Sequence, residues 1–140
     1  MIGLVVDRLI ATAAPPLLSV EAAENLDALG KGTAARHGAA FVIPMRERAS
    51  ANRFAGGAFE QEVTVEIAVA VAIRAQDSAK GGKRAVLIEG FQAALEASLA
   101  GWRPRPDSQL MDYLGADSAP FGNGLTWWVA VWRTSRWIRK

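Results

Sequence analysis

Three glutamates, Glu60, Glu62 and Glu66, have the residue type and spacing that could support acid–base chemistry or bind a hard cation. Alternate residues of a strand lie about 6 to 7 Å apart on one face, so carboxylates at this spacing can act as a pair. However, no histidine, acidic loop motif or glycine bend accompanies them in the sequence. We therefore interpret them as a solvated or partner-facing end of a strand.

The remaining chemistry-bearing residues form no catalytic or metal-binding pattern. His37 is the single histidine, in a small polar segment without partner spacing, and we expect it to be solvated. The absence of cysteine excludes disulfides, thiolate metal sites and cysteine nucleophiles. No serine lies in a nucleophile elbow, and Gly81-Gly82-Lys83 lacks the spacing of a phosphate-binding loop. The sequence predicts a protein that is not an enzyme and holds no cofactor and no metal.

Basic and aromatic residues are interspersed near the C-terminus, at Trp132, Arg133, Arg136, Trp137 and Arg139. Such a segment can bind single-stranded nucleic acid through base stacking and charge. The net charge of +2 is small for that role, and no nucleic-acid-binding fold motif accompanies the segment. A small nucleic-acid-binding module is therefore an alternative, and sequence-specific recognition is not expected.

Length and composition describe one globular domain over residues 1–140. The chain has 140 residues, of which 51% are hydrophobic and 21% charged, values typical of a soluble domain with a real core. No basic segment followed by an apolar run begins the chain, so no signal peptide is expected. Charges interrupt the longest apolar runs, so no membrane association is expected.

The stretch from Phe59 to Arg74 organises the predicted fold. Large β-branched residues occupy its odd positions from Val63 to Ile73, which predicts a long strand whose odd face is core. The even face changes from charged residues to alanine at Ala68. Alanine leaves room for a helix or a second subunit to pack closely.

Helical periodicity predicts two main amphipathic helices, over residues 1–14 and 84–100. Pro15 and Pro16 end the first, and Gly101 ends the second. Ser19 is expected to cap a shorter helix. The other predicted elements are that helix over 20–29, strands over 40–45, 108–115 and 125–138, a loop over 46–58, and turns over 76–83 and 116–124.

This order predicts an α+β fold: a mostly antiparallel sheet of about four strands, two main helices on one face and a long β-hairpin loop. The last strand contains Trp127, Trp128 and Trp132. Three tryptophans within six residues exceed what one small core usually holds, which favours a contact with a partner.

Several short motifs occur in a characteristic order that covers nearly the whole chain. They are Pro15-Pro16, Val20–Leu29, Ala40–Pro44, Arg46-Glu47-Arg48, Asn52, Gln61–Val65, Ile73–Ala75, Leu99–Pro104, Trp127-Trp128 and Trp132–Thr134. In this order the chain resembles the tail terminator, or tail completion, proteins of tailed phages and prophages.

The resemblance implies a structural protein without catalytic residues. Such proteins form a hexameric ring that caps the last ring of the tail tube, ends tube polymerisation and presents the surface for joining the head. The implied partners are other copies of the chain, the major tail tube protein and a head–tail connector or neck protein. The implied location is the virion tail, after assembly in the cytoplasm of the bacterial host. Another connector or neck protein is the nearest alternative.

A closed ring needs two complementary faces on each subunit. The basic residues Arg46, Arg48 and Arg53 precede the acidic strand end at Glu60 and Glu62, and each patch could meet its opposite on a neighbour. Pairing within one hairpin, or plain solvation, is the alternative. The full set of expected interface residues is Arg46, Arg48, Arg53, Phe54, Glu60, Glu62, Trp128, Trp132, Arg136 and Trp137.

Overall fold

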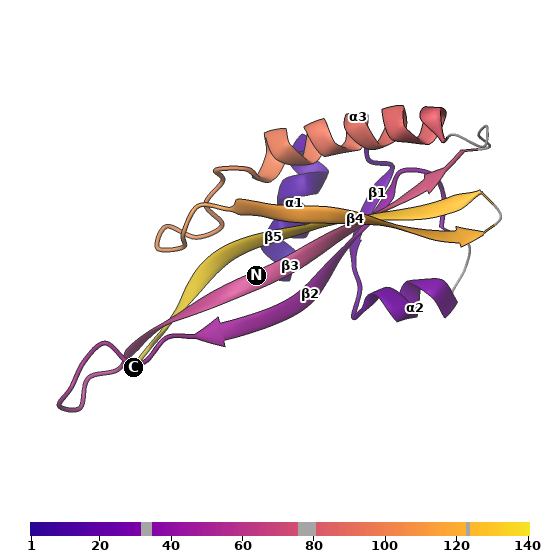
Figure 1. Cartoon of the computed structure of the whole chain (residues 1–140). Coiled ribbons are helices and arrows are strands. Elements are labelled where there is room, and N and C mark those ends of the chain that lie inside the picture. The colour runs from indigo at the N-terminus through magenta and orange to yellow at the C-terminus, as the bar shows by residue number, and fades with distance from the viewer. Residues whose placement is uncertain (32–34, 76–80, 123) are drawn as a thin grey trace.

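The computed structural model describes residues 1–31, 35–75, 81–122 and 124–140. Its elements are α1 (Ile2–Thr12), β1 (Ser19–Ala22), α2 (Leu26–Lys31), β2 (Ala39–Ala49), β3 (Glu60–Arg74), α3 (Gly82–Leu99), β4 (Asp112–Gly122) and β5 (Leu125–Arg139) (Figure 1). The α+β class is confirmed. The described part has five strands and three helices, where about four strands were expected.

The five strands form one mixed sheet in the order β1-β2-β3-β5-β4. β1 runs parallel to β2, and the other neighbours are antiparallel. β3 and β5 have 15 residues each, as expected for the two longest strands, and pair along their whole length from Glu60 opposite Arg139 to Arg74 opposite Leu125. This ladder forms the centre of the fold.

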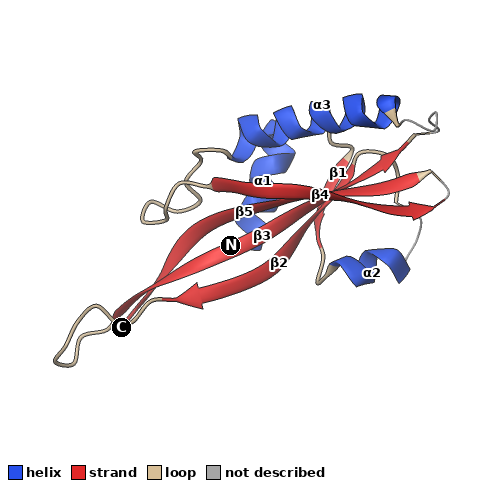
Figure 2. Cartoon of the chain, viewed as in Figure 1, coloured by secondary structure: helices blue, strands red, loops and turns tan. Residues whose placement is uncertain are grey.

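The main core lies between the sheet and two helices, α1 and α3, which cover the same face (Figure 2). Val5 and Leu9 of α1 and Leu95 of α3 are fully buried against the odd face of β3. Both the core face of β3 and the placement of the two main helices are confirmed.

A smaller apolar cluster covers the alanine half of the opposite face. Ala68, Ala70 and Ala72 of β3 pack there with Trp127, and the short helix α2 contributes Leu26 and Leu29. Figure 2 shows α2 on the side of the sheet opposite α1 and α3. The space that the alanines leave is therefore filled within the chain.

The premise that one chain of this size does not bury the three tryptophans is wrong. Trp127 belongs to the small cluster and is 1% exposed, while Trp128 and Trp132 belong to the main core at 4% and 1%. A sheet with a core on both faces holds more aromatic volume than the single core assumed from the sequence. Trp128 and Trp132 therefore have little surface left for a partner.

The helix expected over 20–29 is also wrong in its first half. Ser19–Ala22 form strand β1, which pairs with residues 39–42 of β2. The backbone N–H of Ala28 donates to the side-chain oxygen of Asn25 at 2.7 Å, so Asn25 rather than Ser19 caps the helix that follows. Pairing with a strand distant in sequence overrides the local helical pattern.

β2 continues four residues beyond the strand expected over 40–45. Arg46 and Arg48, expected in a loop, lie in this strand opposite Glu66 and Thr64 of β3. The register shifts between Pro44 and Arg46, where proline has no N–H for the ladder. Met45 has no partner in the ladder, and the strand resumes because the long β3 pairs with Arg46 to Ala49.

β4 also extends further than expected, over residues 112–122 instead of 108–115. Most of the turn expected over 116–124 is therefore strand. Pro120 is tolerated because β4 is an edge strand that pairs only with β5 among the described strands. The register of this ladder shifts twice, between Tyr113 and Gly115 and between Pro120 and Gly122.

His37 is not a freely solvated histidine. Its Nδ1 accepts the backbone N–H of Arg74 at 3.1 Å, and its ring meets Phe91 edge-on with centroids 5.5 Å apart. It is partly buried and joins the end of β3 to α3. The turn predicted over 76–83 includes residues 76–80, which lie outside the described residues.

Candidate interaction site

The loop that joins β2 to β3 protrudes from the body of the molecule, well beyond the helices (Figure 1). Its centre is Asn52. The side-chain oxygen of Asn52 accepts the backbone N–H groups of Phe54 at 3.3 Å and Glu60 at 2.9 Å. Its amide group donates to the carbonyls of Phe54 and Ala58 at 2.9 and 3.1 Å. One side chain thus closes the loop in a defined shape.

Arg53 holds an aromatic side chain at this loop. Its guanidinium donates to Glu60 at 3.0 Å and lies 5.6 Å from the ring centroid of Phe54 and 5.7 Å from that of Trp137. Phe54 is still 44% exposed. The result is an aromatic ring that is ordered by its neighbours but not covered by them.

The C-terminal end of β5 supports the base of the hairpin. The indole N–H of Trp137 donates to the carbonyl of Asp107 at 3.0 Å, and Arg139 lies 5.0 Å from the Trp137 ring centroid. Arg139 also forms a close ion pair with Asp107 and lies 3.7 Å from Glu60. The hydrogen bond from Arg139 lowers the pKa of Asp107. Sequence reasoning missed Asp107, because it reaches this site from a distant segment.

The charges near the hairpin mostly pair within the chain. Arg46 lies 2.7 Å from Glu66 across the β2–β3 ladder, and Gln109 donates to Glu62 at 3.2 Å. With the Arg53–Glu60 pair, this is the local pairing that the sequence left open as an alternative. Arg48 is exposed and forms no ion pair within the described part of the chain.

Arg136 lies on the other face of the sheet from these pairs. Its guanidinium donates two hydrogen bonds to the carboxylate of Glu47, at 3.0 and 2.9 Å. These bonds lower the pKa of Glu47 and raise that of Arg136. Glu47 and Arg136 stand opposite Val65 and Val63 in the ladder, so the pair covers the exposed end of the main core.

The structure therefore brings together part of the expected interface and separates the rest. Arg53, Phe54, Glu60 and Trp137 meet at the hairpin, with Glu62 beside them on the same strand face. Trp128, Trp132 and Arg136 lie elsewhere. Asn52 and Arg139 are additions whose role no local pattern indicates.

No group of three or more histidine, aspartate or glutamate side chains among the described residues could hold a metal ion. Within the same residues, no helix is both long and apolar enough to span a membrane. What stands out is an ordered, exposed aromatic hairpin, a feature suited to contact another protein.

The sequence matches the family model described as phage tail terminator protein, over residues 2–140. The chain belongs to the phage tail terminator family. No curated protein sequence gives a match.

As a member of this family, the protein has a structural role in phage tail assembly and is a component of the virion tail. It works among other phage tail components.

Proposed function

We propose that the chain forms a ring that caps the end of the phage tail tube, stops tube polymerisation and provides the surface to which the head is joined. The resemblance implies six subunits, with the major tail tube protein on one side and a connector or neck protein on the other. The chain is encoded by a phage or prophage genome, and the ring assembles in the cytoplasm of the bacterial host.

The observation that carries this proposal is the preorganised hairpin. The Asn52 side chain donates two hydrogen bonds and accepts two, and with the stacking of Arg53 these fix the loop outside the body of the molecule. Phe54 adds nothing to either apolar cluster. An aromatic group ordered before contact binds a partner at low entropic cost, so the hairpin supports a role in assembly.

The sheet supports a ring because its two edges differ. On one side, β4 is an outer strand that pairs only with β5 among the described strands. On the other, β1 covers β2 only along residues 39–42, so residues 43–49 pair with β3 alone among the strands that the structure describes. Two different edges on one subunit suit a head-to-tail contact, which closes into a ring when the rotation permits.

Arg48 is the best remaining candidate for a charged contact between subunits. Arg46 and Arg53 already pair with Glu66 and Glu60 in their own chain. The guanidinium of Arg48 is exposed near the hairpin and has no such ion pair within the described residues. A charge at the rim of an interface sets register and association rate more than affinity.

Electron microscopy of tails made with and without the protein tests the proposal. We expect tubes of irregular, excessive length without it, and none that join heads. Normal-length, head-competent tails in its absence would refute the terminator role. Normal-length tails that fail to join heads would identify a neck protein instead.

A matched pair of variants refines this test. Phe54→Ser removes the exposed ring from the hairpin and should reproduce the defect, while Val86→Ser, at a residue 68% exposed on α3, should not.

The nucleic-acid alternative is disfavoured because Arg53, Arg136 and Arg139 pair with carboxylates of the chain itself. It predicts salt-sensitive binding of single-stranded DNA, which we do not expect.

A further inference from the structure

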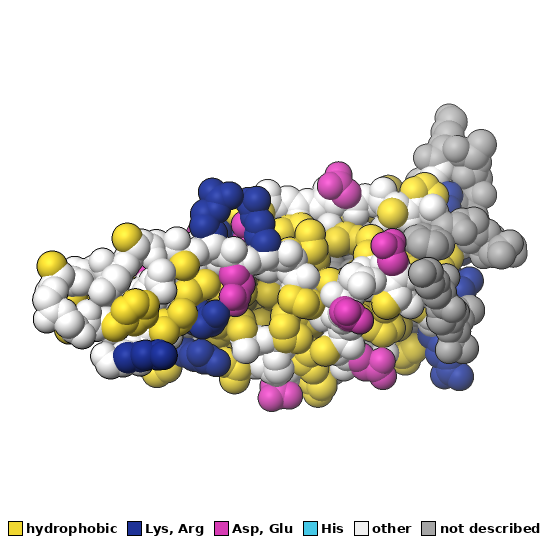
Figure 3. All heavy atoms as spheres, turned by 90° about the horizontal axis from the view of Figure 1, so that it is seen from below, with side chains coloured by type: hydrophobic (Ala, Val, Ile, Leu, Met, Phe, Trp, Pro, Cys, Tyr) yellow, Lys and Arg dark blue, Asp and Glu magenta, His cyan; other side chains and the backbone are white. Residues whose placement is uncertain are grey.

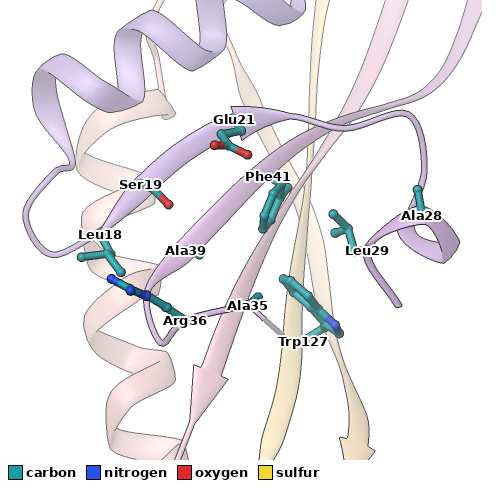
Figure 4. Close-up of a pocket in the computed structure, with 10 residues that line it drawn as sticks. All are labelled: Leu18, Ser19, Glu21, Ala28, Leu29, Ala35, Arg36, Ala39, Phe41 and Trp127. Carbon is teal, nitrogen blue, oxygen red and sulfur yellow. The ribbon is translucent and has the colours of Figure 1, made fainter. Parts of the chain in front are cut away.

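Two long stretches of strand have an edge that no other described strand covers. β4 pairs only with β5, and residues 43–49 of β2 pair only with β3 among the strands that the structure describes. The covered part of β2 is visible in Figure 4, where Ser19 and Glu21 of β1 lie beside Ala39 and Phe41. An uncovered edge presents backbone N–H and C=O groups to which another strand can bind.

In the free stretch of β2, alternate backbone groups face away from β3. Just beyond the strand, the N–H of Ser50 donates to the carbonyl of Glu62 at 2.8 Å. Bonded and non-bonded positions alternate along an antiparallel ladder, so the N–H and C=O groups of Glu47 and Ala49 face outward. An extended segment with an uncovered edge of its own can pair with them, and β4 of another copy is such a segment.

Strand direction favours β4 of a second copy as the occupant of this edge. The strands β2, β3, β5 and β4 alternate in direction, so β2 and β4 run in opposite directions. Neighbouring subunits of a ring are related by rotation, so β4 of one copy can lie beside β2 of the next as an antiparallel strand. Antiparallel pairing at these edges also keeps the α2 side of one sheet continuous with the α2 side of the next.

On the α2 side, each of the two edges carries one exposed charge without an ion pair. Arg48 stands opposite Thr64, on the face of β3 that continues as Ala68. Asp117 stands opposite Val129, which packs against the small apolar cluster on the same side. Arg48 and Asp117 are exposed, and neither forms an ion pair within the part of the chain that the structure describes. Figure 3 views this side of the molecule and shows charges of both signs on it.

The other charged residues of these two edges already pair within their own chain. The pairs are Arg46–Glu66, Glu47–Arg136 and Asp112–Arg133. Over residues 43–49 and 112–122, one cation is thus left on the β2 edge and one anion on the β4 edge. Opposite charges on matching sides of two antiparallel edges favour a second copy of the chain as the partner.

We propose that β4 of one copy pairs antiparallel with residues 43–49 of β2 in the neighbouring copy, with Asp117 opposite Arg48. This rests on the proposed function, in which copies of the chain form a ring. The same register places Met45, which is 54% exposed, beside the exposed Pro120. The backbone ladder provides affinity, and the ion pair sets the register. The contact is heterologous, because the two edges are different surfaces of each subunit.

Charge reversal tests the pairing of Arg48 with Asp117. Arg48→Asp and Asp117→Arg are made singly and together, and ring formation is followed by mass in solution and electron microscopy. Each single variant places like charges opposite each other, so we expect it to weaken each contact by about fivefold. The double variant restores opposite charges and should recover ring formation. The matched control is Glu89→Arg, the same charge change as Asp117→Arg at an exposed residue of α3, which should assemble like the parent.

Cysteine crosslinking tests the strand contact while both charges stay in place. The natural chain contains no cysteine, so the single variants Ala49→Cys and Ser118→Cys each carry one reactive thiol at an exposed residue. In the proposed register they are diagonal neighbours on one side of the contact, about 7–8 Å apart. The two variants are mixed and treated with a short bismaleimide, as purified chain and in assembled tails. The control replaces Ser118→Cys with Val86→Cys, an exposed position on α3.

We expect a crosslinked dimer from the 49 and 118 pair wherever rings form, and little or none from the 49 and 86 pair or from either variant alone. Rings without a 49–118 product, or single charge reversals that assemble like the parent, overturn the edge contact and leave the proposed ring standing. A 49–118 product without rescue by the double reversal overturns the pairing of Arg48 with Asp117. A crosslink from position 118 to another tail protein overturns the contact in favour of that partner. Absence of rings of the parent chain in both preparations overturns the contact and the proposed ring together.

Discussion

Replacing Val69 by aspartate tests the assignment of the core most directly. Val69 is 0% exposed in the middle of β3, between Val42 of β2 and Ala130 of β5 in the ladder. Its side chain belongs to the main core beneath α1 and α3. A carboxylate placed there has no cation within the apolar cluster to pair with.

The cost has two parts. Losing the buried valine removes about 1.5–3 kcal/mol, and an uncompensated buried charge costs about 3–5 kcal/mol. The sum of about 5–8 kcal/mol is comparable with the whole stability of a domain, about 5–15 kcal/mol. We therefore expect Val69→Asp to be unfolded or barely folded.

Two further variants calibrate the result. Val69→Ala removes two carbons, so it should lose about 1.6 kcal/mol in transfer free energy plus a cavity contribution, and remain folded. Val86→Asp, at a side chain 68% exposed, should change stability by no more than about 0.5 kcal/mol. The assay is urea unfolding followed by tryptophan fluorescence and circular dichroism. A Val69→Asp protein that unfolds at the same urea concentration as the parent would refute the assignment of the core face.

Four other predictions follow from single features. Asn52→Ala removes four loop hydrogen bonds, so limited proteolysis should cut the hairpin faster while the melting temperature changes little; an unchanged cleavage rate would contradict our account of the loop. Gly90→Ala should stabilise the isolated chain by about 0.5–1 kcal/mol, since an added Cβ meets nothing within 4 Å in the chain; destabilisation in urea would reveal a contact that the described structure lacks. The hydrogen bonds from Arg136 lower the pKa of Glu47 from 4.5, so the stability that they contribute is present above pH 4.5 and is lost as the pH falls through the lowered pKa. The Glu47→Gln variant should therefore lose less stability than the parent on acidification. Equal losses of stability in urea titrations would argue against the pair. Arg48→Glu should reduce ring formation, measured by mass in solution, without changing the melting temperature, and normal rings would eliminate this residue from the interface.

Sequence patterns predicted the elements whose apolar period is long and unbroken. β3 and β5 were predicted nearly to the residue. For β3 the signal was the alternation of β-branched residues from Val63 to Ile73, and for β5 it was an apolar, aromatic run as far as Trp132. The core face of β3 and the helix α3 followed from the same kind of evidence. These features depend on which apolar side chains are buried on folding, and the spacing of those residues in the sequence already indicates this.

Only the tertiary structure decided the elements whose pattern is short or polar. β1 and the far end of β2 form because distant strands offer backbone partners, which outweigh the local preference for a helix or loop. The same applies to the interaction site. Arg53 and Phe54 could be suspected from the sequence, whereas Asp107 joins them from a loop far along the chain. The sequence determined that the tryptophans had to be covered, but their distribution over two faces of one sheet depended on how α2 and α1 pack, which no local pattern records.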